Sequence, residues 1–328
     1  MLFIDNKGIT DPRINLAIEE YALKNLDINE TYLLFYINEP SIIIGKNQNT
    51  IEEINTEYVE ANGIHVVRRL SGGGAVYHDL GNLNFSFITK DDGESFHNFR
   101  KFTEPVVHAL KKLGVNAELS GRNDLLAEGR KISGNAQFST KGRMFSHGTL
   151  LFDSEMDNVV SALRVKKDKI ESKGIKSIRS RVANISEFLT DKLSIEEFRA
   201  LLLKNIFEDS EVPEYVLSEE DWNKIYELSK ERYQNWEWNY GKSPKFNLQH
   251  SHRFPVGQID VRLEVNKGII ENCKIYGDFF GVGDVKEIEN KLLNIRYEKK
   301  ELEKALKDVD ITHYFGHVSK EEFLNLIY

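Results

Sequence analysis

Residues 68–82 have the sequence RRLSGGGAVYHDLGN. Residues 64–67 before them are mostly β-branched, and residues 83–88 after them alternate in part between apolar and polar side chains, so the two flanks are typical of strands, the second half-buried. Three consecutive glycines allow a backbone to approach a ligand and to point several N–H groups into one anion-binding concavity. The adjacent arginines add forked donors for phosphate or carboxylate oxygens. The pattern leaves two interpretations open, an anion site or a glycine-rich hairpin with solvated arginines.

The glycine-rich segment differs from two common nucleotide-binding patterns. It lacks the G-x-x-x-x-G-K-S/T sequence of a Walker loop, and it lacks G-x-G-x-x-G between a strand and a helix. We expect its glycines to connect one strand to another. A nucleotide bound there would therefore lie over a sheet.

The composition is that of a globular protein with room for two domains. The chain has 328 residues, of which 40% are hydrophobic and 29% charged. The net charge of −8 argues against a general nucleic-acid binder. Cys273 is the only cysteine, which excludes an intramolecular disulfide and a thiolate metal cluster. The first residues do not resemble a signal peptide, and the apolar run 32–37 is too short to span a bilayer, so we expect a cytoplasmic protein with no membrane partner.

The first half of the chain shows alternating strand and helix signals. Asp11 and Pro12 are suited to the N-cap and the first turn of a helix. Strands at 31–37 and 41–44 are separated by Asn38-Glu39-Pro40, which is a hairpin signal. The other expected elements are a strand at 2–5, helices at 52–61 and 96–113, and a strand at 115–119.

Polar, glycine-punctuated strands follow at 121–126, 129–137 and 144–152, and we expect them to form a second wall of the same sheet system. Lys131 lies in this region beside core-type residues. An edge-strand or solvated lysine is the ordinary interpretation of its position. Residues 164–176 include six basic side chains, for which a solvated loop is the default and a lid over an anionic ligand is the alternative.

A domain boundary is expected near Lys242-Ser243-Pro244. The aromatic segment 236–241 before it is typical of a core or a domain interface. Beyond it the pattern changes to three strands followed by helices at about 284–294, 299–306 and 319–328. We therefore predict an α/β (α+β) protein with a large domain at 1–245, in which helices flank mixed sheets, and a small α+β domain at 246–328.

Several long motifs, in one order over nearly the whole chain, resemble the lipoate–protein ligase A family. They are RRLSGGGAVYHDLGN at 68–82, GRNDL at 121–125, GRKISGNA at 129–136, HGTLL at 147–151, SKGIKS at 172–177 with SRVAN at 180–184, and WEWNYG at 236–241. The related biotin ligases carry a Gly-Arg-Gly-Arg type of loop, which this chain lacks. The resemblance implies a large catalytic domain of biotin-ligase type and a small C-terminal domain.

The resemblance also implies a two-step reaction. ATP and lipoate give lipoyl-adenylate and pyrophosphate, and the lipoyl group then passes to one lysine of a carrier domain. The implied carriers are the E2 subunits of 2-oxoacid dehydrogenases and the H protein of glycine cleavage. ATP and Mg²⁺ are the implied cofactors. Relative use of lipoate and octanoate, and the group that takes the proton from the attacking amine, are not assigned by the motifs.

Residue by residue, the family motifs imply the following roles. Lys131 is the catalytic residue, which touches both the acyl carbonyl and the α-phosphate. The ATP-binding residues are Arg69, Gly74, Ala75, Val76, Tyr77 and Lys131, with Asn123 and Asp124 as further candidates and Asp124 as a metal ligand. The lipoate-binding residues are Leu16, Glu19, Tyr36, Ser71, His78, His147 and Lys131, although core packing competes as an explanation for Leu16 and Tyr36.

Two other functions share parts of this pattern. Octanoyl- or lipoyl-transferases of the same fold form a thioester on a cysteine of the catalytic domain. Cys273, the sole cysteine, lies in the expected small domain and outside every motif, which disfavours that route. A non-catalytic lipoate-binding protein could dispense with Lys131 and the phosphate loop, and both are present.

Overall fold

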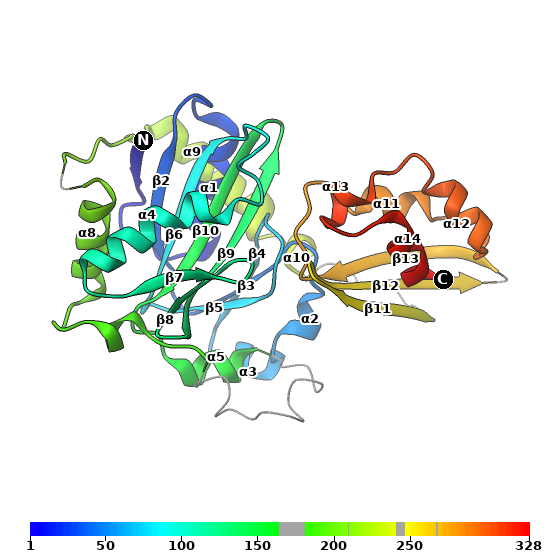
Figure 1. Cartoon of the computed structure of the whole chain (residues 1–328), viewed down its shortest axis with the longest axis horizontal. Coiled ribbons are helices and arrows are strands. Elements are labelled where there is room, and N and C mark those ends of the chain that lie inside the picture. The colour runs from blue at the N-terminus through cyan, green and yellow to red at the C-terminus, as the bar shows by residue number, and fades with distance from the viewer. Residues whose placement is uncertain (164–180, 209, 241–246, 267) are drawn as a thin grey trace.

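The computed structural model describes residues 1–163, 181–208, 210–240, 247–266 and 268–328. Figure 1 shows a large part built from β1 to β10 beside a small part built from β11 to β13 and α11 to α14. The predicted α/β (α+β) fold class is confirmed. The basic run at 164–176 and the expected boundary at Lys242-Ser243-Pro244 lie outside the described residues.

The main sheet contains seven of the described strands, with β1 parallel to β2 and the other neighbours antiparallel. Its order is β1 (Leu2–Asp5), β2 (Tyr32–Ile37), β6 (Asn82–Lys90), β10 (Arg143–Leu151), β9 (Arg130–Thr140), β8 (Asp124–Ala127) and β7 (Ala117–Ser120). The strands predicted at 121–126, 129–137 and 144–152 thus lie in one sheet, which also contains the strand predicted at 2–5.

A second sheet has the order β4 (His65–Arg68), β3 (Ser41–Ile44) and β5 (Val76–His78). The glycines at 72–74 connect β4 to β5, which confirms the predicted strand-to-strand connection. The predicted hairpin of 31–37 with 41–44 is wrong, because β2 and β3 belong to different sheets. The connection leads from the main sheet to the second sheet instead of forming a surface turn. Asn38 at its start is fully buried and hydrogen-bonded to Asn15 and His78.

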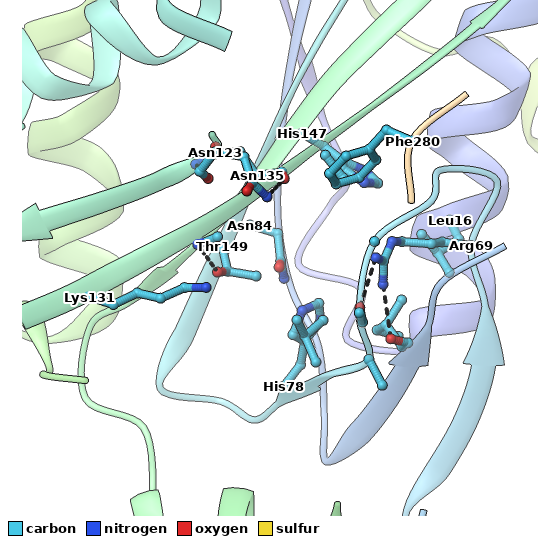
Figure 2. Close-up of a pocket in the computed structure, with 18 of the residues that line it drawn as sticks. Leu16, Arg69, His78, Asn84, Asn123, Lys131, Asn135, His147, Thr149 and Phe280 are labelled. Atoms are coloured by element: carbon cyan, nitrogen blue, oxygen red, sulfur yellow. Dashed lines mark hydrogen bonds between the residues drawn. The ribbon is translucent and has the colours of Figure 1, made fainter. Parts of the chain in front are cut away.

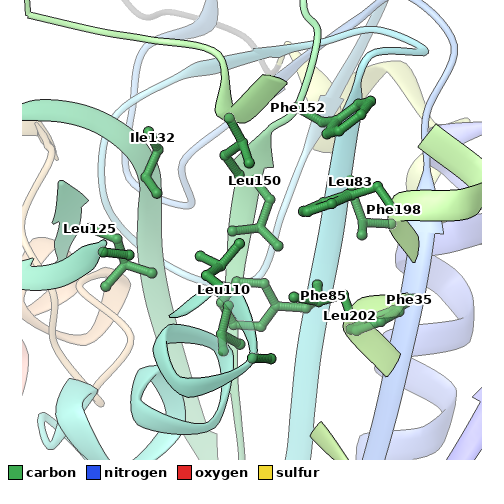
Figure 3. Close-up of a cluster of buried hydrophobic side chains, with 14 of the residues drawn as sticks. Phe35, Leu83, Phe85, Leu110, Leu125, Ile132, Leu150, Phe152, Phe198 and Leu202 are labelled. Carbon is green, nitrogen blue, oxygen red and sulfur yellow. The ribbon is translucent and has the colours of Figure 1, made fainter. Parts of the chain in front are cut away.

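Helices cover both faces of the main sheet. On one face α4 (Phe99–Lys112) and α8 (Ile195–Ile206) pack on a core that includes Phe35 and Phe85 (Figure 3). On the other face α1 (Pro12–Asn25), α9 (Glu219–Leu228) and the π-turn η2 (Ser229–Tyr233) share a core with the second sheet. Both faces of β2 are therefore buried, which explains why its sequence does not alternate.

Helix ends follow the sequence signals closely. Asp11 caps α1 by accepting the N–H of Arg13, and Ser194 caps α8 through a reciprocal capping box with Glu197. The helix expected at 52–61 is two short ones, α2 (Thr50–Glu53) and α3 (Thr56–Ala61). The helix expected at 96–113 begins only at Phe99. Short elements at α5 (Met156–Ala162), η1 (Ile185–Phe188) and α10 (Trp236–Asn239) complete the large part.

The small part has a hydrophobic core of its own. It consists of the sheet β11 (Leu248–Phe254), β12 (Gly257–Asn266) and β13 (Ile269–Gly277), covered by α11 (Lys286–Lys291), α12 (Lys299–Ala305), α13 (Ile311–Phe315) and α14 (Lys320–Ile327). It contacts the large part through the Arg262–Glu52 ion pair, at 2.6 Å, and through Gly277 N–H donating to Asn47 O at 2.7 Å.

Candidate functional site

A cavity lies between the glycine loop and the β8–β10 side of the main sheet, and it is closed on one side by Phe280 from the small part (Figure 2). Ten residues predicted for ATP or lipoate line it. They are Leu16, Tyr36, Arg69, Gly74, Ala75, Val76, His78, Asn123, Lys131 and His147. The glycine loop and Lys131 thus face the same space.

The three glycines of the loop have different surroundings. A Cβ on Gly72 would lie 2.3 Å from Phe279 O, so the small part packs directly on this residue. Gly73 has φ +89°, a left-handed conformation that favours glycine, and a Cβ there would meet the Phe280 ring at 3.0 Å. Gly74 is exposed and its Cβ position is open. Gly74 is therefore the glycine of the three whose surroundings leave room for a ligand.

Arg69 shapes the loop with its buried guanidinium. Its Nε donates to Ser71 Oγ at 2.9 Å, Nη1 to Ile43 O at 3.0 Å, and Nη2 to Gly72 O and Gly74 O at 2.6 and 2.9 Å. Burial lowers its pKa to about 10, so it stays charged at neutral pH. Most of its donors are therefore occupied by the protein, and Arg69 fixes the curvature of the loop before any phosphate arrives.

Arg68 has a matching role one residue earlier. Its Nη1 donates to the carbonyls of Gly45, Lys46 and Gln48 at 2.7–3.0 Å, and its Nε donates to Trp238 O at 2.9 Å. Trp238 in turn donates its ring N–H to Arg68 O at 2.8 Å. The aromatic segment predicted to fill a core or interface thus does so through Trp238, whereas Trp236 is 54% exposed.

Lys131 lies on β9, where it pairs with Leu126 of β8 on one side and exchanges backbone hydrogen bonds with Arg181 and Ala183 on the other, so it is not an edge-strand lysine. The β8–β9 pairing shifts register between Leu125 and Leu126, opposite Lys131, and such irregularities re-aim side chains. Its Nζ is 2.8 Å from Asp124 Oδ1, and both side chains are a little over one third exposed. A Cβ on Gly134 would be 3.2 Å from Nζ, so this glycine leaves room for the ammonium group.

A buried hydrogen-bond chain supports the cavity wall behind the glycine loop. Ser71 Oγ lies 2.8 Å from His147 Nε2, and His147 Nδ1 lies 2.8 Å from Glu19 Oε1. Ser71 also accepts the Nε–H of Arg69, so its own hydroxyl proton is available for His147 Nε2. This arrangement assigns the Nδ1–H tautomer to His147, which donates to Glu19. The chain connects α1 to the glycine loop through a cavity-lining histidine.

The polar face of β6 forms part of the interior. Leu83, Phe85 and Phe87 pack in the core on one side, whereas Asn82 and Ser86 point to the other side and are fully buried. Asn84 lines the cavity and donates to Tyr36 O at 3.2 Å. The half-buried strand predicted at 83–88 is therefore buried on both faces, because its polar residues face the cavity region rather than solvent.

Four predicted site residues lie outside the cavity lining. Glu19 and Ser71 stand behind His147, as described above. Tyr77 packs in a hydrophobic cluster beneath the second sheet and pairs with Ile42 across β3 and β5. Asp124 reaches the site through its ion pair with Lys131. Glu19 and Ser71 therefore hold His147 in place by hydrogen bonds and do not line the cavity themselves.

Family models match two segments of the chain. The lipoyl protein ligase A/B catalytic domain matches residues 11–207, and the bacterial lipoate protein ligase C-terminus matches residues 243–327. The chain belongs to the lipoate–protein ligase family. It is 72% identical to the Bacillus subtilis lipoate-protein ligase LplJ over 331 residues, with both chains covered in full. The resemblance inferred from the motifs is thereby confirmed.

Solved structures of other ligases share the fold. P. falciparum LipL1 in complex with lipoate is 26% identical, with a TM-score of 0.77 over 99% of this chain and 96% of that chain. A lipoate-protein ligase A bound with ATP is 32% identical, with a TM-score of 0.63 over 73% and 98%. The bi-partite ligase of Thermoplasma acidophilum, studied with its E2 lipoyl domain, is 33% identical, with a TM-score of 0.66 over 75% and 98%.

The ligase cavity also contains residues that the sequence did not single out. Some of these residues lie inside the family motifs quoted above, and that position was the signal that could have identified them. They are Gly73, Arg122, Gly134, Asn135, Ala136, Gly148 and Thr149. Ile43, Asn84 and Phe280 lay outside the motifs. Phe280 packs against Phe99 and Ala136, and its ring centroid lies 4.4 Å from the guanidinium carbon of Arg122. No pattern in residues 246–328 indicated such a contact.

No helix in the described part of the ligase is long and apolar enough to cross a bilayer. No group of three or more His, Cys, Asp or Glu side chains there is arranged to hold a metal ion.

Proposed function

We propose that this ligase activates lipoate with ATP in the cavity described above and transfers the lipoyl group to a lysine of a carrier domain. The observation that carries the proposal is that the Lys131 ammonium and the Gly74–Ala75–Val76 backbone line one cavity. A cation and a row of amides on opposite sides of a space can hold a carboxylate and a triphosphate together.

In the first step a lipoate carboxylate oxygen attacks the α-phosphorus of ATP, and the bond to the bridging oxygen of the β-phosphate breaks. Pyrophosphate leaves and lipoyl-adenylate remains. The carboxylate is ionised at neutral pH, so this step needs no general base. The main barrier is the repulsion and alignment of two anions, which preorganised donors lower.

In this scheme Lys131 lies between the two anions and follows the negative charge as the new bond forms. The amides of Gly74, Ala75 and Val76 hold the phosphates, and Arg69 keeps these amides in place by binding the loop carbonyls. The positioning role for Arg69 replaces the direct phosphate contact predicted from the sequence, since most of its donors are already used.

The acyl chain of lipoate would occupy the enclosed end of the cavity. Leu16, Tyr36 and Ile43 line that end and belong to the apolar core of the second face. His147 closes it, held by Ser71 and Glu19. An apolar slot with a few fixed polar groups suits a substrate with an aliphatic tail and one polar end.

In the second step the ε-amine of a carrier lysine attacks the adenylate carbonyl, the C–O bond to phosphate breaks, and AMP leaves. Lys131 can stabilise the oxyanion that develops on that carbonyl. The proposed carriers are lipoyl domains of 2-oxoacid dehydrogenase E2 subunits and the H protein of glycine cleavage. The Thermoplasma ligase studied with an E2 lipoyl domain supports this class of partner. We place the reaction in the cytoplasm, where ATP and such carriers are found.

Mg²⁺ fits the site as a companion of the substrate phosphates. Magnesium binds through one or two carboxylates together with phosphate oxygens, so a preformed cluster of acidic residues is not required. Asp124 would hold it, with Asn123 beside it, once Lys131 has turned toward the ligands. The ion would neutralise phosphate charge. We also assign residues 1–245 to catalysis and 246–328 to the accessory domain.

The transferase alternative is disfavoured by the cysteine. Cys273 is buried on β13 in the small part, and burial raises its pKa to about 12. A thiol in that environment is a poor nucleophile.

The test is lipoate-dependent exchange of labelled pyrophosphate into ATP, followed by transfer to a lipoyl domain. Wild-type protein should catalyse exchange only when lipoate is present, and Lys131→Ala should lose activity by at least about a hundredfold. Lys300→Ala, an exposed lysine on α12, is the matched control and should behave as wild type. Unchanged exchange in a folded Lys131→Ala protein would contradict the proposal.

A further inference from the structure

A second cavity, here called the junction cavity, has a volume of about 390 Å³ and lies where the large part meets the small part beside α10 (Figure 1). The large part lines it with Lys46, Asn47, Gln48, Asn49, Arg68, Glu237, Trp238 and Tyr240, and the small part with Lys274, Ile275, Tyr276, Asp284, Val285, Lys286 and Glu289. None of these residues lines the cavity of the glycine loop, and the proposed function uses none of them. The volume is in the range of sites that bind small molecules.

Two nearly buried carboxamides of the junction cavity have hydrogen-bonding capacity left. Asn49 occupies the N-cap position of α2 but makes no side-chain capping bond, and it is only 8% exposed. Gln48 is 5% exposed; its side-chain oxygen accepts the N–H of Gly45 at 2.9 Å, and its amide nitrogen has no acceptor in the described part of the chain. Neither amide is among the unpaired atoms that are sealed from solvent, so each can be reached from the cavity. Because buried polar groups are normally hydrogen-bonded, these two indicate a ligand.

The junction cavity also carries positive charge without a bonded carboxylate. Arg68 is 9% exposed, and its guanidinium donates only to neutral oxygens, most of them backbone carbonyls. The half-buried Lys46 has no hydrogen-bond acceptor or ion-pair partner for its Nζ among the described residues, and this atom lies 5.6 Å from the centroid of the Phe138 ring. Burial lowers the pKa of the Lys46 ammonium group, and from the small part Asp284 raises it and Lys286 lowers it. A partly buried cation without a partner costs free energy, which an anion in the cavity offsets.

A phosphate group suits these donors better than a carboxylate does. Its oxygens can accept hydrogen bonds from an ammonium group and from two amides at once, whereas a carboxylate offers fewer oxygens. Across the cavity, Lys274 is already paired with Glu289 at 2.8 Å, and Lys286 at the start of α11 is exposed. We propose that the junction cavity binds a phosphate-bearing anion, which the large part holds through Lys46 and the amides of the 46–49 loop, and which the small part holds through Lys286.

The bound anion ties the small part to the glycine loop without entering the cavity of that loop. A Cβ on Gly45 would lie 1.9 Å from Gly73 O, so the loop at 45–49 packs directly on the glycine loop. From the small part, the N–H of Gly277 donates to Asn47 O at 2.7 Å. An anion bound to both walls therefore adds to the contacts that hold the two parts together. The site is regulatory, and it goes beyond the proposed function without depending on it.

The indole of Trp238 reports on the junction cavity, because this residue lines the cavity and donates its ring N–H to a backbone carbonyl of the cavity wall at 2.8 Å. Inorganic phosphate should shift the Trp238 signal in a ¹H–¹⁵N spectrum of the full chain and leave the signal of the Trp222 indole, on α9, in place. Lys46→Gln and Lys286→Gln should each raise the Kd of phosphate by about tenfold or more, since each removes a charge-assisted hydrogen bond. Lys300→Gln removes an equal charge from an exposed position on α12 and serves as the control.

The same titration of Lys131→Ala protein tests whether phosphate acts from the glycine-loop cavity, and the Trp238 shift should persist there. No Trp238 shift in wild type, loss of the shift in Lys131→Ala, or an equal Kd in wild type and Lys46→Gln would overturn the proposal. Weaker binding in Lys46→Gln but not in Lys286→Gln would overturn the bridge between the two parts. If Lys46→Gln does not fold, Asn49→Asp, which adds a like charge to the cavity, should weaken phosphate binding instead. Titration with AMP decides the source of the group: tighter binding than phosphate assigns a nucleotide, and binding no tighter assigns free phosphate.

Discussion

Lys131 Nζ lies 2.8 Å from Asp124 Oδ1, and this ion pair is the polar contact at the centre of the proposed reaction site. Both side chains are more than one third exposed, so water screens the pair and its contribution to stability is small. Exchanging Asp124 for a phosphate oxygen therefore costs the ammonium group little. Before substrates bind, the ion pair keeps the ammonium group and the carboxylate together. In the proposed reaction the ammonium group then binds the substrate anions, and the carboxylate binds Mg²⁺.

If Asp124 passes from Lys131 to Mg²⁺ when ATP binds, Asp124→Asn should raise the Mg²⁺ concentration for half-maximal activity by about tenfold or more, because an amide is a weaker magnesium ligand than a carboxylate. The measurement is lipoate-dependent pyrophosphate release over a Mg²⁺ titration. Asp308→Asn, an exposed carboxylate in the small part, serves as the control. A variant with lower maximal rate but an unchanged Mg²⁺ requirement would limit Asp124 to restraining Lys131.

The glycine loop should tolerate a methyl group at one position and resist it at another. In Gly72→Ala the new Cβ would lie 2.3 Å from Phe279 O, so the small part must shift, and we expect a loss of about 1–3 kcal/mol in the free energy of unfolding. In Gly74→Ala the methyl meets open space, so stability should change by less than about 0.5 kcal/mol. Urea unfolding of both variants checks this, and equal losses would contradict the packing difference.

Arg69→Lys should weaken ATP binding through the shape of the loop. A lysine has one nitrogen with three donors in place of the three nitrogens that bind Ser71, Ile43, Gly72 and Gly74, so it cannot hold all four acceptors and the loop amides lose their fixed orientation. We expect KM for ATP to rise by about tenfold. Arg68→Lys is the matched control, since Arg68 is equally buried but holds residues 45–48, outside the cavity lining. It should lower stability with a much smaller effect on KM for ATP; equal effects on KM would indicate general destabilisation instead.

Local signals in the sequence predicted most elements, because caps and glycines act within a few residues. The N-cap Asp11 began α1 where expected. The pairing of strands that are distant in the sequence was harder to predict. The chain between β2 and β3 has the composition of a hairpin turn, but Asn38 is used in the interior by Asn15 and His78, and this use depends on residues distant in sequence.

The site shows the same division between local and distant information. Lys131 and the residues at 74–76 were predicted from motifs and do line one cavity. The motifs did not distinguish a side chain that touches a ligand from one that supports it, as with Glu19 behind His147. Phe280 could not be predicted, because its place in the wall depends on how the small part packs against Gly72 and Gly73.

His78 should leave a signature in the pH dependence of stability. Its pKa falls from 6.5 to about 3 on folding, so between these values the unfolded chain binds more protons than the folded one. The contribution of neutral His78 is therefore complete above pH 6.5 and is lost as the pH falls toward 3, with a slope of up to about 1.4 kcal/mol per pH unit.

In His78→Gln this single contribution is missing, so the difference in unfolding free energy, wild type minus variant, should grow by roughly 2–3 kcal/mol between pH 4 and pH 7. Urea unfolding at half-unit steps of pH provides the measurement, and comparing wild type with variant removes the contributions of groups that the two proteins share. A pH-independent difference would mean that His78 is protonated alike in the folded and unfolded chains.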